Sequence, residues 1–237
     1  MQLHEISEHN TKIWVSDHVY SDFKLDWFER VPLPAKSSIN QWQSGRQSVV
    51  KFTVGARKMV LRHYCRGGLP ARFSKDHFMF RSFESSRPFK ELILLQRMRQ
   101  LELPVPEPIA ARCRLKGVLY NADIVMSEIV NSKTLAQMVA ENKLEKETWK
   151  KIGQIIWKFH QQGIQHVDLN VNNILLDQEG NVYLIDFDRC VQRPYAQSWA
   201  QVGVNRLKRS LEKQKESKYT TNFHKNDFDS LIQGYQD

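Results

Sequence analysis

The sequence predicts an α+β fold in two parts, in which antiparallel strands dominate the first part and helices dominate the second. Apolar runs at 49–54 and 59–64, separated by a turn at Gly55, are typical of a hairpin of two strands. A further apolar run at 122–126 predicts another strand. The first part is therefore expected to be mainly antiparallel sheet.

Helical spacing of apolar residues appears at 88–101 and returns after Ser132, where it predicts helices at 133–142, 146–162, 195–217 and 226–235. Gly163 is expected to end the strongest of these helices as a C-cap. We expect one domain over 1–130, a second over 131–237, and a hinge at about 126–131. Residues 1–40 suggest no role from the sequence, and only their aromatic positions Trp14, Phe23, Trp27 and Phe28 are predicted as anchors.

The composition of the chain limits the kinds of molecule that the protein is expected to bind. The 237 residues are 41% hydrophobic and carry 35 Lys and Arg against 26 Asp and Glu, a formal charge of +9. This balance favours an anionic partner such as a nucleotide, a membrane surface or a phosphorylated glycolipid. Three scattered cysteines indicate neither a disulfide framework nor a zinc site. Any membrane contact is expected to be peripheral, because no apolar stretch approaches the ~18 residues of a spanning helix.

The segment from His166 to Leu175 resembles the catalytic loop H-x-D-L-x-x-x-N of the protein-kinase-like fold. Asp186-Phe187-Asp188 stands where that fold carries its metal-binding D-F-G. Phosphoryl transfer needs one carboxylate to deprotonate the attacking hydroxyl, and an amide and a second carboxylate to hold Mg²⁺ across the ATP phosphates. Asp168 is the candidate catalytic base, and Asn173 and Asp186 are the candidate metal ligands. A hairpin between 174–176 and 182–185 would bring these two ligands to neighbouring strand ends.

A nucleotide site of this kind also needs a cation on the third strand, paired with a glutamate from a helix. Arg62 stands at the position of the usual lysine, and Lys58 and Lys51 are the alternatives. A guanidinium can form a forked pair with a carboxylate or a phosphate. Glu91, in the first turns of the helix at 88–101, is the expected partner.

Other ATP contacts are predicted from the backbone. Gly45 lies in a short loop before the first strand of the hairpin and could cover the phosphates, although an ordinary turn would look the same. At the hinge, the carbonyl of Glu128 and the amide of Val130 are candidates for adenine binding. An ordinary strand exit would have the same residues.

A peptide substrate is not expected. Only 49 residues follow Asp188, too few for the activation segment and further helices with which protein kinases present a peptide. Asn170 occupies the place where many protein kinases have lysine, and Asp188 replaces the glycine of D-F-G. No nucleic-acid partner is expected either.

Together with the catalytic loop, four further stretches resemble the bacterial 3-deoxy-D-manno-octulosonic acid (Kdo) kinases, members of the lipopolysaccharide kinase family within the protein-kinase-like superfamily. They lie at 62–69 (R-H-Y-C-R-G-G-L), 103–111, 185–188 and 205–210 (N-R-L-K-R-S). The resemblance implies a bilobal protein-kinase-like fold, with a mainly antiparallel β N-lobe and a short, mostly helical C-lobe. It also implies a phosphotransferase that uses ATP to phosphorylate the 4-hydroxyl of Kdo in Kdo-lipid A, at the cytoplasmic side of the inner membrane.

Four basic residues are candidates for contact with the anionic acceptor or with the inner-membrane surface: Arg66, Arg206, Lys208 and Arg209. A solvated basic face would have the same composition. Three alternative functions stay open from the sequence: a lipopolysaccharide heptose kinase, a small-molecule phosphotransferase, and a catalytically silent kinase-like binding module. Intact Asp168, Asn173 and Asp186 argue against the silent module.

Overall fold

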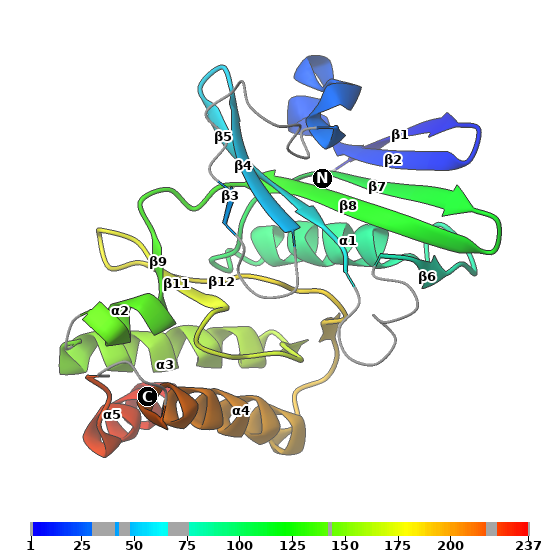
Figure 1. Ribbon diagram of the computed structural model, residues 1–237. Coiled ribbons are helices and arrows are strands. Elements are labelled where there is room, and N and C mark those ends of the chain that lie inside the picture. Colours follow the sequence, from blue (N-terminus) through cyan, green and yellow to red (C-terminus); the bar gives the residue numbers. More distant parts are fainter. Residues whose placement is uncertain are drawn as a thin grey trace. The chain divides into compact units, whose positions relative to one another are not determined.

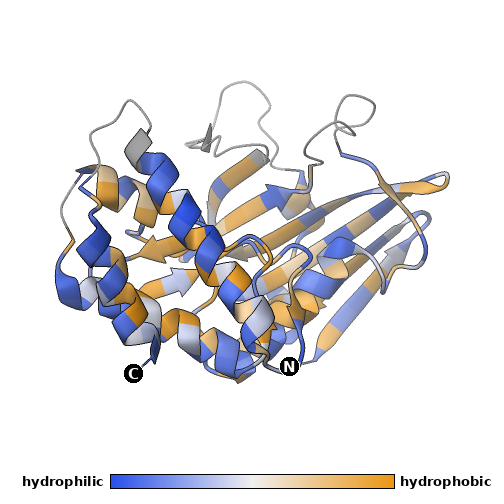
Figure 2. Ribbon diagram, turned by 90° about the horizontal axis from the view of Figure 1, so that it is seen from below, coloured by the Kyte–Doolittle hydropathy of each residue, from blue (hydrophilic) through white to orange (hydrophobic). Residues whose placement is uncertain are grey.

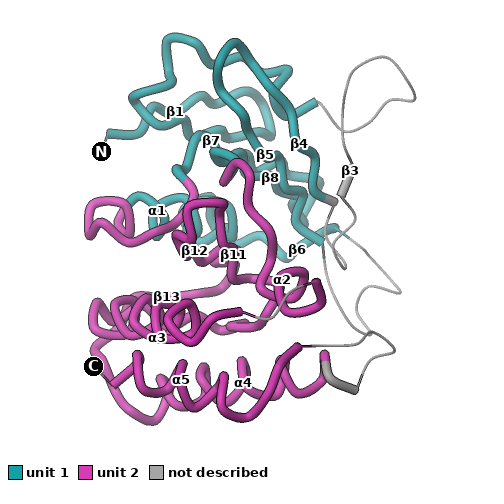
Figure 3. The backbone as a smooth tube through the Cα atoms, turned by 90° about the vertical axis from the view of Figure 1, so that its left-hand side faces the viewer, with its two compact units in different colours: residues 1–96, 107–128 teal, residues 97–106, 129–237 magenta. Residues whose placement is uncertain are grey.

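The structure is a computed structural model that describes residues 2–29, 41–42, 48–65, 76–141, 144–216 and 222–236. The chain divides into two compact units, which Figure 3 distinguishes by colour. Unit 1 comprises Met1–Gln96 and Glu107–Glu128, and unit 2 comprises Arg97–Pro106 and Ile129–Asp237. The last boundary falls inside the expected hinge at 126–131. Arg97–Pro106, which we expected in the first part, groups with unit 2.

Unit 1 is built on an eight-stranded antiparallel sheet (Figure 1). The strand order is β1-β2-β7-β8-β5-β4-β3, with β6 paired to β8. The strands are β1 (Leu3–Glu8), β2 (Thr11–Ser16), β3 (Gln41–Trp42), β4 (Ser48–Val54), β5 (Arg57–His63), β6 (Phe78–Met79), β7 (Pro108–Lys116) and β8 (Leu119–Ser127). The predicted strands at 49–54, 59–64 and 122–126 are confirmed as β4, β5 and β8.

Elements cover both faces of this sheet. On β2, Ile13 and Val15 belong to the same buried cluster as Trp27 and Phe28 of the 3₁₀ helix η2 (Leu25–Phe28). Trp14 points to the opposite face because side chains alternate along a strand, and its ring centre lies 4.8 Å from that of Phe89 in helix α1 (Arg87–Gln100). The anchors Trp14, Trp27 and Phe28 are fully buried, and Phe23 is half-buried, as the sequence predicts. A second 3₁₀ helix, η1 (Asp17–Asp22), precedes η2.

Helix α1 (Arg87–Gln100) is the helix predicted at 88–101. Pro88 lies in its first turn, where a missing backbone N–H costs nothing. At the other end Glu102 adopts a left-handed φ of 54°, and the amide of Leu103 returns to the carbonyl of Met98 at 3.0 Å. This left-handed turn ends the helix before Pro104.

Unit 2 is mostly helical. Its helices are α2 (Leu135–Glu141), α3 (Lys146–Gln161), α4 (Gln197–Glu216) and α5 (Lys225–Gln236), and all four were predicted. Its short strands are β9 (Lys133–Thr134), β10 (Ile164–Gln165), β11 (Ile174–Leu176), β12 (Val182–Leu184) and β13 (Val191–Gln192). Strand β11 pairs with β12 and β9, and β10 pairs with β13. The predicted hairpin at 174–185 is therefore confirmed.

Two glycines allow the backbones of α3 and α5 to come into direct contact. A Cβ at Gly153 would lie 2.0 Å from the carbonyl oxygen of Leu231, and one at Gly234 would lie 2.1 Å from that of Lys150. The helices carry both polar and apolar residues, which appear as blue and orange bands in Figure 2. Such a mixture is typical of amphipathic helices. None of the helices in the described part of the chain combines the length and apolarity needed to cross a membrane.

Candidate active site

Helix α3 leads directly into the predicted catalytic loop. Gly163 closes the helix at a left-handed φ of 71°, and its amide donates to the carbonyl of His160 at 2.9 Å. A Cβ at Gly163 would lie 2.1 Å from the carbonyl oxygen of Arg193. Both the left-handed backbone and the lack of space therefore exclude a larger residue at this position. The predicted C-cap is confirmed. The loop then runs from strand β10 to strand β11.

Buried His166 connects the loop to the metal motif. Its Nε2 lies 3.0 Å from the carbonyl oxygen of Ile185, and its Nδ1 lies 3.3 Å from the amide of Asp168. A carbonyl can only accept and an amide can only donate, so the ring is neutral with its proton on Nε2. Burial lowers the pKa of His166, which maintains this neutral form. The imidazole thus fixes the backbone of Asp168 relative to the residue that precedes Asp186.

Asn173 is held in place by hydrogen bonds of both its side chain and its backbone. Its Nδ2 donates to the carbonyl of Asp168 at 2.9 Å, and its carbonyl accepts from the amide of Ile185 at 3.1 Å. With Nδ2 committed to the loop, the amide oxygen is the atom left to face a ligand. An amide oxygen and the carboxylate of Asp186 are hard donors of the kind that Mg²⁺ prefers, so these two residues fit that ion.

Asp186 adopts a left-handed backbone conformation, with φ of 65°. A residue other than glycine takes this conformation only where its surroundings impose it, and such positions concentrate at functional sites. The next residue supplies the constraint: the buried ring of Phe187 stacks on Phe159 of α3 at 5.9 Å and meets His166 edge-on at 4.9 Å. The motif after β12 is therefore anchored by its central aromatic ring.

The side chain of Asp168 pairs with an arginine from α4. Arg206 Nη1 lies 3.2 Å from Asp168 Oδ1, with the two side chains 45% and 52% exposed. One turn further along α4, Ser210 Oγ accepts a hydrogen bond from the amide of Val171 at 3.3 Å. Two residues of the N-R-L-K-R-S motif thus contact the catalytic loop. An ion pair this exposed stabilises the fold by about 1 kcal/mol or less.

The other members of the basic run at 206–209 do not share this contact. Lys208 Nζ lies over the ring of Phe228 in α5, 5.6 Å from its centre, and Arg209 is exposed. Leu207 and Leu211 are fully buried, so the apolar side predicted for this helix is confirmed.

In unit 1, Arg62 pairs with Glu91, as predicted. Arg62 Nη2 donates to Glu91 Oε2, and Tyr64 Oη donates to the same oxygen at 2.5 Å. The side chains of Arg62 and Glu91 are only 5% and 0% exposed. Alternation along β5 explains the contact: Met59 and Leu61 face η2, so Arg62 faces α1. Its role toward ATP stays a prediction.

Tyr64 was missed from the sequence. The signal was present in the R-H-Y stretch, because a tyrosine two residues after Arg62 lies on the same side of an extended chain. Ser210 was also missed, since only the docking of α4 brings it to the loop.

Both alternative cations contact Glu128, Lys51 through its side chain and Lys58 through its backbone. Lys51 Nζ binds the carboxylate of Glu128 at 2.8 Å, and the carbonyl of Lys58 accepts from the amide of Glu128 at 2.9 Å. The backbone amide of Glu128 is therefore engaged, while the predicted adenine contacts, its carbonyl and the amide of exposed Val130, stay predictions. Gly45 and Arg66 lie outside the described residues.

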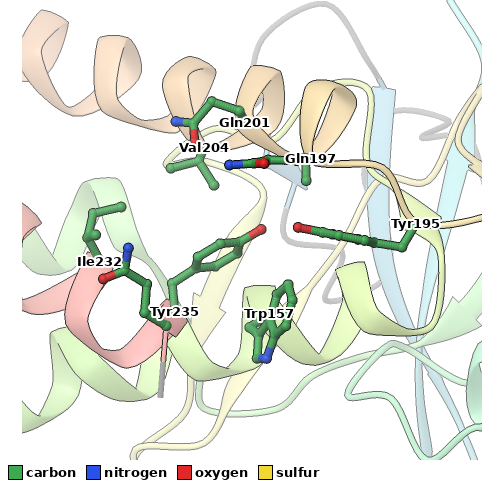
Figure 4. A pocket seen from close by; sticks show the side chains of 9 residues that line it. Trp157, Tyr195, Gln197, Gln201, Val204, Ile232 and Tyr235 are labelled. Carbon is green, nitrogen blue, oxygen red and sulfur yellow. The ribbon is translucent and has the colours of Figure 1, made fainter.

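Unit 2 also contains a pocket of about 300 Å³ between α3, α4 and α5 (Figure 4). Trp157, Tyr195 and Tyr235 form its aromatic walls, and the hydroxyl groups of the two tyrosines point toward one another. His160 Nδ1 lies 2.6 Å from the hydroxyl of Tyr235. Asp168, Asn173 and Asp186 are not among the lining residues, so the pocket is separate from the predicted transfer site.

Comparison with known proteins decides the family. Residues 37–235 match the model of the family described as "Lipopolysaccharide kinase (Kdo/WaaP) family". The chain belongs to the lipopolysaccharide kinase (Kdo/WaaP) family. It is 40% identical over 177 residues to a 3-deoxy-D-manno-octulosonic acid kinase of Vibrio vulnificus, covering 75% of this chain and 74% of that protein. The kinase of the same name from Vibrio parahaemolyticus is 32% identical over 90% of this chain and 89% of its own length.

Among solved structures, a chain described as "WaaP in complex with acyl carrier protein" superposes with a TM-score of 0.55. It covers 85% of this chain and 78% of that chain at 14% sequence identity, which supports the fold alone. Membership of the kinase family and this superposition confirm the predicted protein-kinase-like α+β fold.

Proposed function

We propose that this protein is an ATP-dependent Kdo kinase, which phosphorylates the 4-hydroxyl of Kdo in Kdo-lipid A during lipopolysaccharide inner-core synthesis. The observation that carries the proposal is the loop of unit 2, in which Asn173 holds the backbone of Asp168 and His166 ties that loop to the residue before Asp186. The names of the curated relatives, 3-deoxy-D-manno-octulosonic acid kinases, support Kdo as the sugar that is phosphorylated.

In this reaction Asp168 is the general base. Its carboxylate orients the acceptor hydroxyl and takes its proton as the hydroxyl oxygen attacks the γ-phosphorus of ATP. The bond between the γ-phosphorus and the bridging oxygen breaks, and ADP leaves. Asp168 is half exposed within a loop fixed by His166 and Asn173, so an acceptor can reach the carboxylate while the backbone of Asp168 stays fixed.

Asn173 and Asp186 would hold Mg²⁺ through their side-chain oxygens, and that ion neutralises charge on the β- and γ-phosphates when bound. Within unit 1, the role of Arg62 is to contact the nucleotide phosphates, while buried Glu91, itself bound by the hydroxyl of Tyr64, keeps the guanidinium in place.

The acceptor is a membrane glycolipid, so the protein is proposed to act as a peripheral protein at the cytoplasmic side of the inner membrane. Exposed Arg209 supports contact with an anionic lipid surface, because a basic residue near such a surface gains about 1 kcal/mol.

The test is a panel of acceptors incubated with purified protein, ATP and Mg²⁺, followed by mass analysis. Kdo-lipid A should gain one phosphate. A heptosylated core, free sugars and aminoglycosides separate the alternative kinases, and transfer to one of these in preference to Kdo-lipid A would refute the proposal. Nucleotide binding without transfer to any acceptor would favour the silent module.

A further inference from the structure

The pair between Arg206 and Asp168 in unit 2 differs in exposure from the pair between Arg62 and Glu91 in unit 1. Arg62 and Glu91 are buried, whereas Arg206 and Asp168 are both about half exposed. A buried pair cannot lose one partner without leaving a charge in the protein interior, but an exposed pair exchanges partners at little cost. The guanidinium of Arg206 is therefore available to another anion that enters beside Asp168.

Helix α4 keeps Arg206 at this position. Leu207 and Leu211 are fully buried, and Ser210 Oγ accepts a hydrogen bond from the amide of Val171, so the stretch of α4 that follows Arg206 is fixed against the loop. Lys208 turns to the ring of Phe228. Within the described part of the basic run, Arg206 is the residue that contacts the predicted base.

The loop itself supplies no cation beside Asp168. Asn170, at the position where many protein kinases have lysine, uses its Nδ2 on the carbonyl of Asp168 at 3.0 Å and its Oδ1 on the amide of Asn172 at 2.8 Å. The positive charge next to the base comes instead from α4. This charge lies where the acceptor must enter, because a hydroxyl that loses its proton to Asp168 must come within hydrogen-bonding distance of that carboxylate.

We propose that Arg206 binds a carboxylate of the acceptor and thereby selects sugar acids as substrates. The planar guanidinium offers paired N–H donors that match a carboxylate, and binding there moves Arg206 from Asp168 onto the acceptor. The base is released from its ion pair only when an acceptor of the right charge is present. This inference rests on the proposed function, since Kdo carries a carboxylate on the same ring as the hydroxyl that is phosphorylated.

The test compares two acceptors, Kdo-lipid A and the same glycolipid with the Kdo carboxylate converted to a carboxamide. With Kdo-lipid A, Arg206→Gln should raise the acceptor KM by about 10- to 100-fold, the range for loss of a charge-assisted hydrogen bond, and leave the ATP KM unchanged. Arg206→Lys should recover part of the loss. With the carboxamide, wild type and Arg206→Gln should have the same acceptor KM. Arg193→Gln is the matched control, the same change at an exposed arginine that binds Gln165.

Equal losses on both acceptors, or a raised ATP KM, would overturn the role of Arg206; the second result would move it to the phosphoryl group. Thermal melting of each variant separates loss of fold from loss of recognition. If wild-type protein phosphorylates a different acceptor, the proposed function fails. Wild type and Arg206→Gln are then compared on that acceptor, with its anionic group intact and with it neutralised. This comparison tests the inference separately.

Discussion

Replacing Arg62 by methionine should destabilise the protein far more than any comparable change at an exposed pair. The substitution keeps the bulk of the side chain but removes the positive charge that pairs with the fully buried carboxylate of Glu91. The hydrogen bond that Tyr64 donates to this carboxylate is kept. Removing one partner of a buried pair costs about 3–5 kcal/mol. In a chain of 237 residues this corresponds to a melting temperature lower by roughly 6–20 °C.

The assay is urea unfolding with and without ATP, and two further variants make it decisive. Arg57→Met removes an arginine from the same strand, β5, but from an exposed pair with Asp22, and should cost about 1 kcal/mol or less. The double variant Arg62→Met with Glu91→Gln removes both charges and keeps an acceptor for Tyr64. It should recover most of the lost stability while ATP use stays impaired.

A loss below about 1 kcal/mol for Arg62→Met would contradict the reasoning, because the site would then behave like an exposed pair. Strictly additive effects of the two single changes would also contradict it. Full ATP use by a stable double variant would reduce the pair to a purely structural role.

Four further results are expected. Asp168→Asn should keep its fold and ATP affinity but lose about 10²-fold or more in turnover, measured in a steady-state transfer assay. Asp186→Ala should raise the Mg²⁺ concentration needed for half-maximal activity in a metal titration, and an unchanged titration would remove it from the metal site. Gly153→Ala should lower stability by about 3 kcal/mol or abolish folding, because its Cβ would overlap the backbone of α5, while Gln154→Ala on the exposed face of α3 should change the urea midpoint little. Burial lowers the pKa of His160 to about 4, so the unfolded chain binds a proton first as the pH falls below about 6.5. The contribution of His160 to stability should drop by about 3 kcal/mol between pH 6.5 and 4. In urea titrations His160→Gln should remove that contribution, while the part due to His166, whose pKa burial also lowers, should remain.

Most of the predicted transfer site could be read from the sequence because its residues are close along the chain. Asp168 and Asn173 share one loop, and the hairpin from Ile174 to Leu184 brings Asp186 back beside them. The pair of Arg62 with Glu91 was also predictable. One residue lies on a strand and the other on the helix that covers it, so alternation along the strand determines which face meets the helix.

The parts that were missed depend on pairing between distant segments. Strand β2 joins the sheet by pairing Thr11 with Arg114 of β7, and it is buried from both faces, so the usual alternation of polar and apolar residues is absent. The contact of Arg206 with Asp168 likewise depends on where α4 docks. Helical periodicity gave the buried side of α4 through Leu207 and Leu211, but no local pattern indicates which loop its polar side meets.

The central claim is that the loop around Asp168 transfers the γ-phosphoryl group of ATP to the 4-hydroxyl of Kdo. The most direct measurement is to isolate the glycolipid after incubation with ATP and Mg²⁺ and to locate the new phosphate by NMR and fragment masses. Wild-type protein should yield one phosphate on the 4-oxygen of Kdo, and Asp168→Asn should yield almost none in the same time. A phosphate on lipid A or on another hydroxyl, or equal product from the folded variant, would contradict the claim.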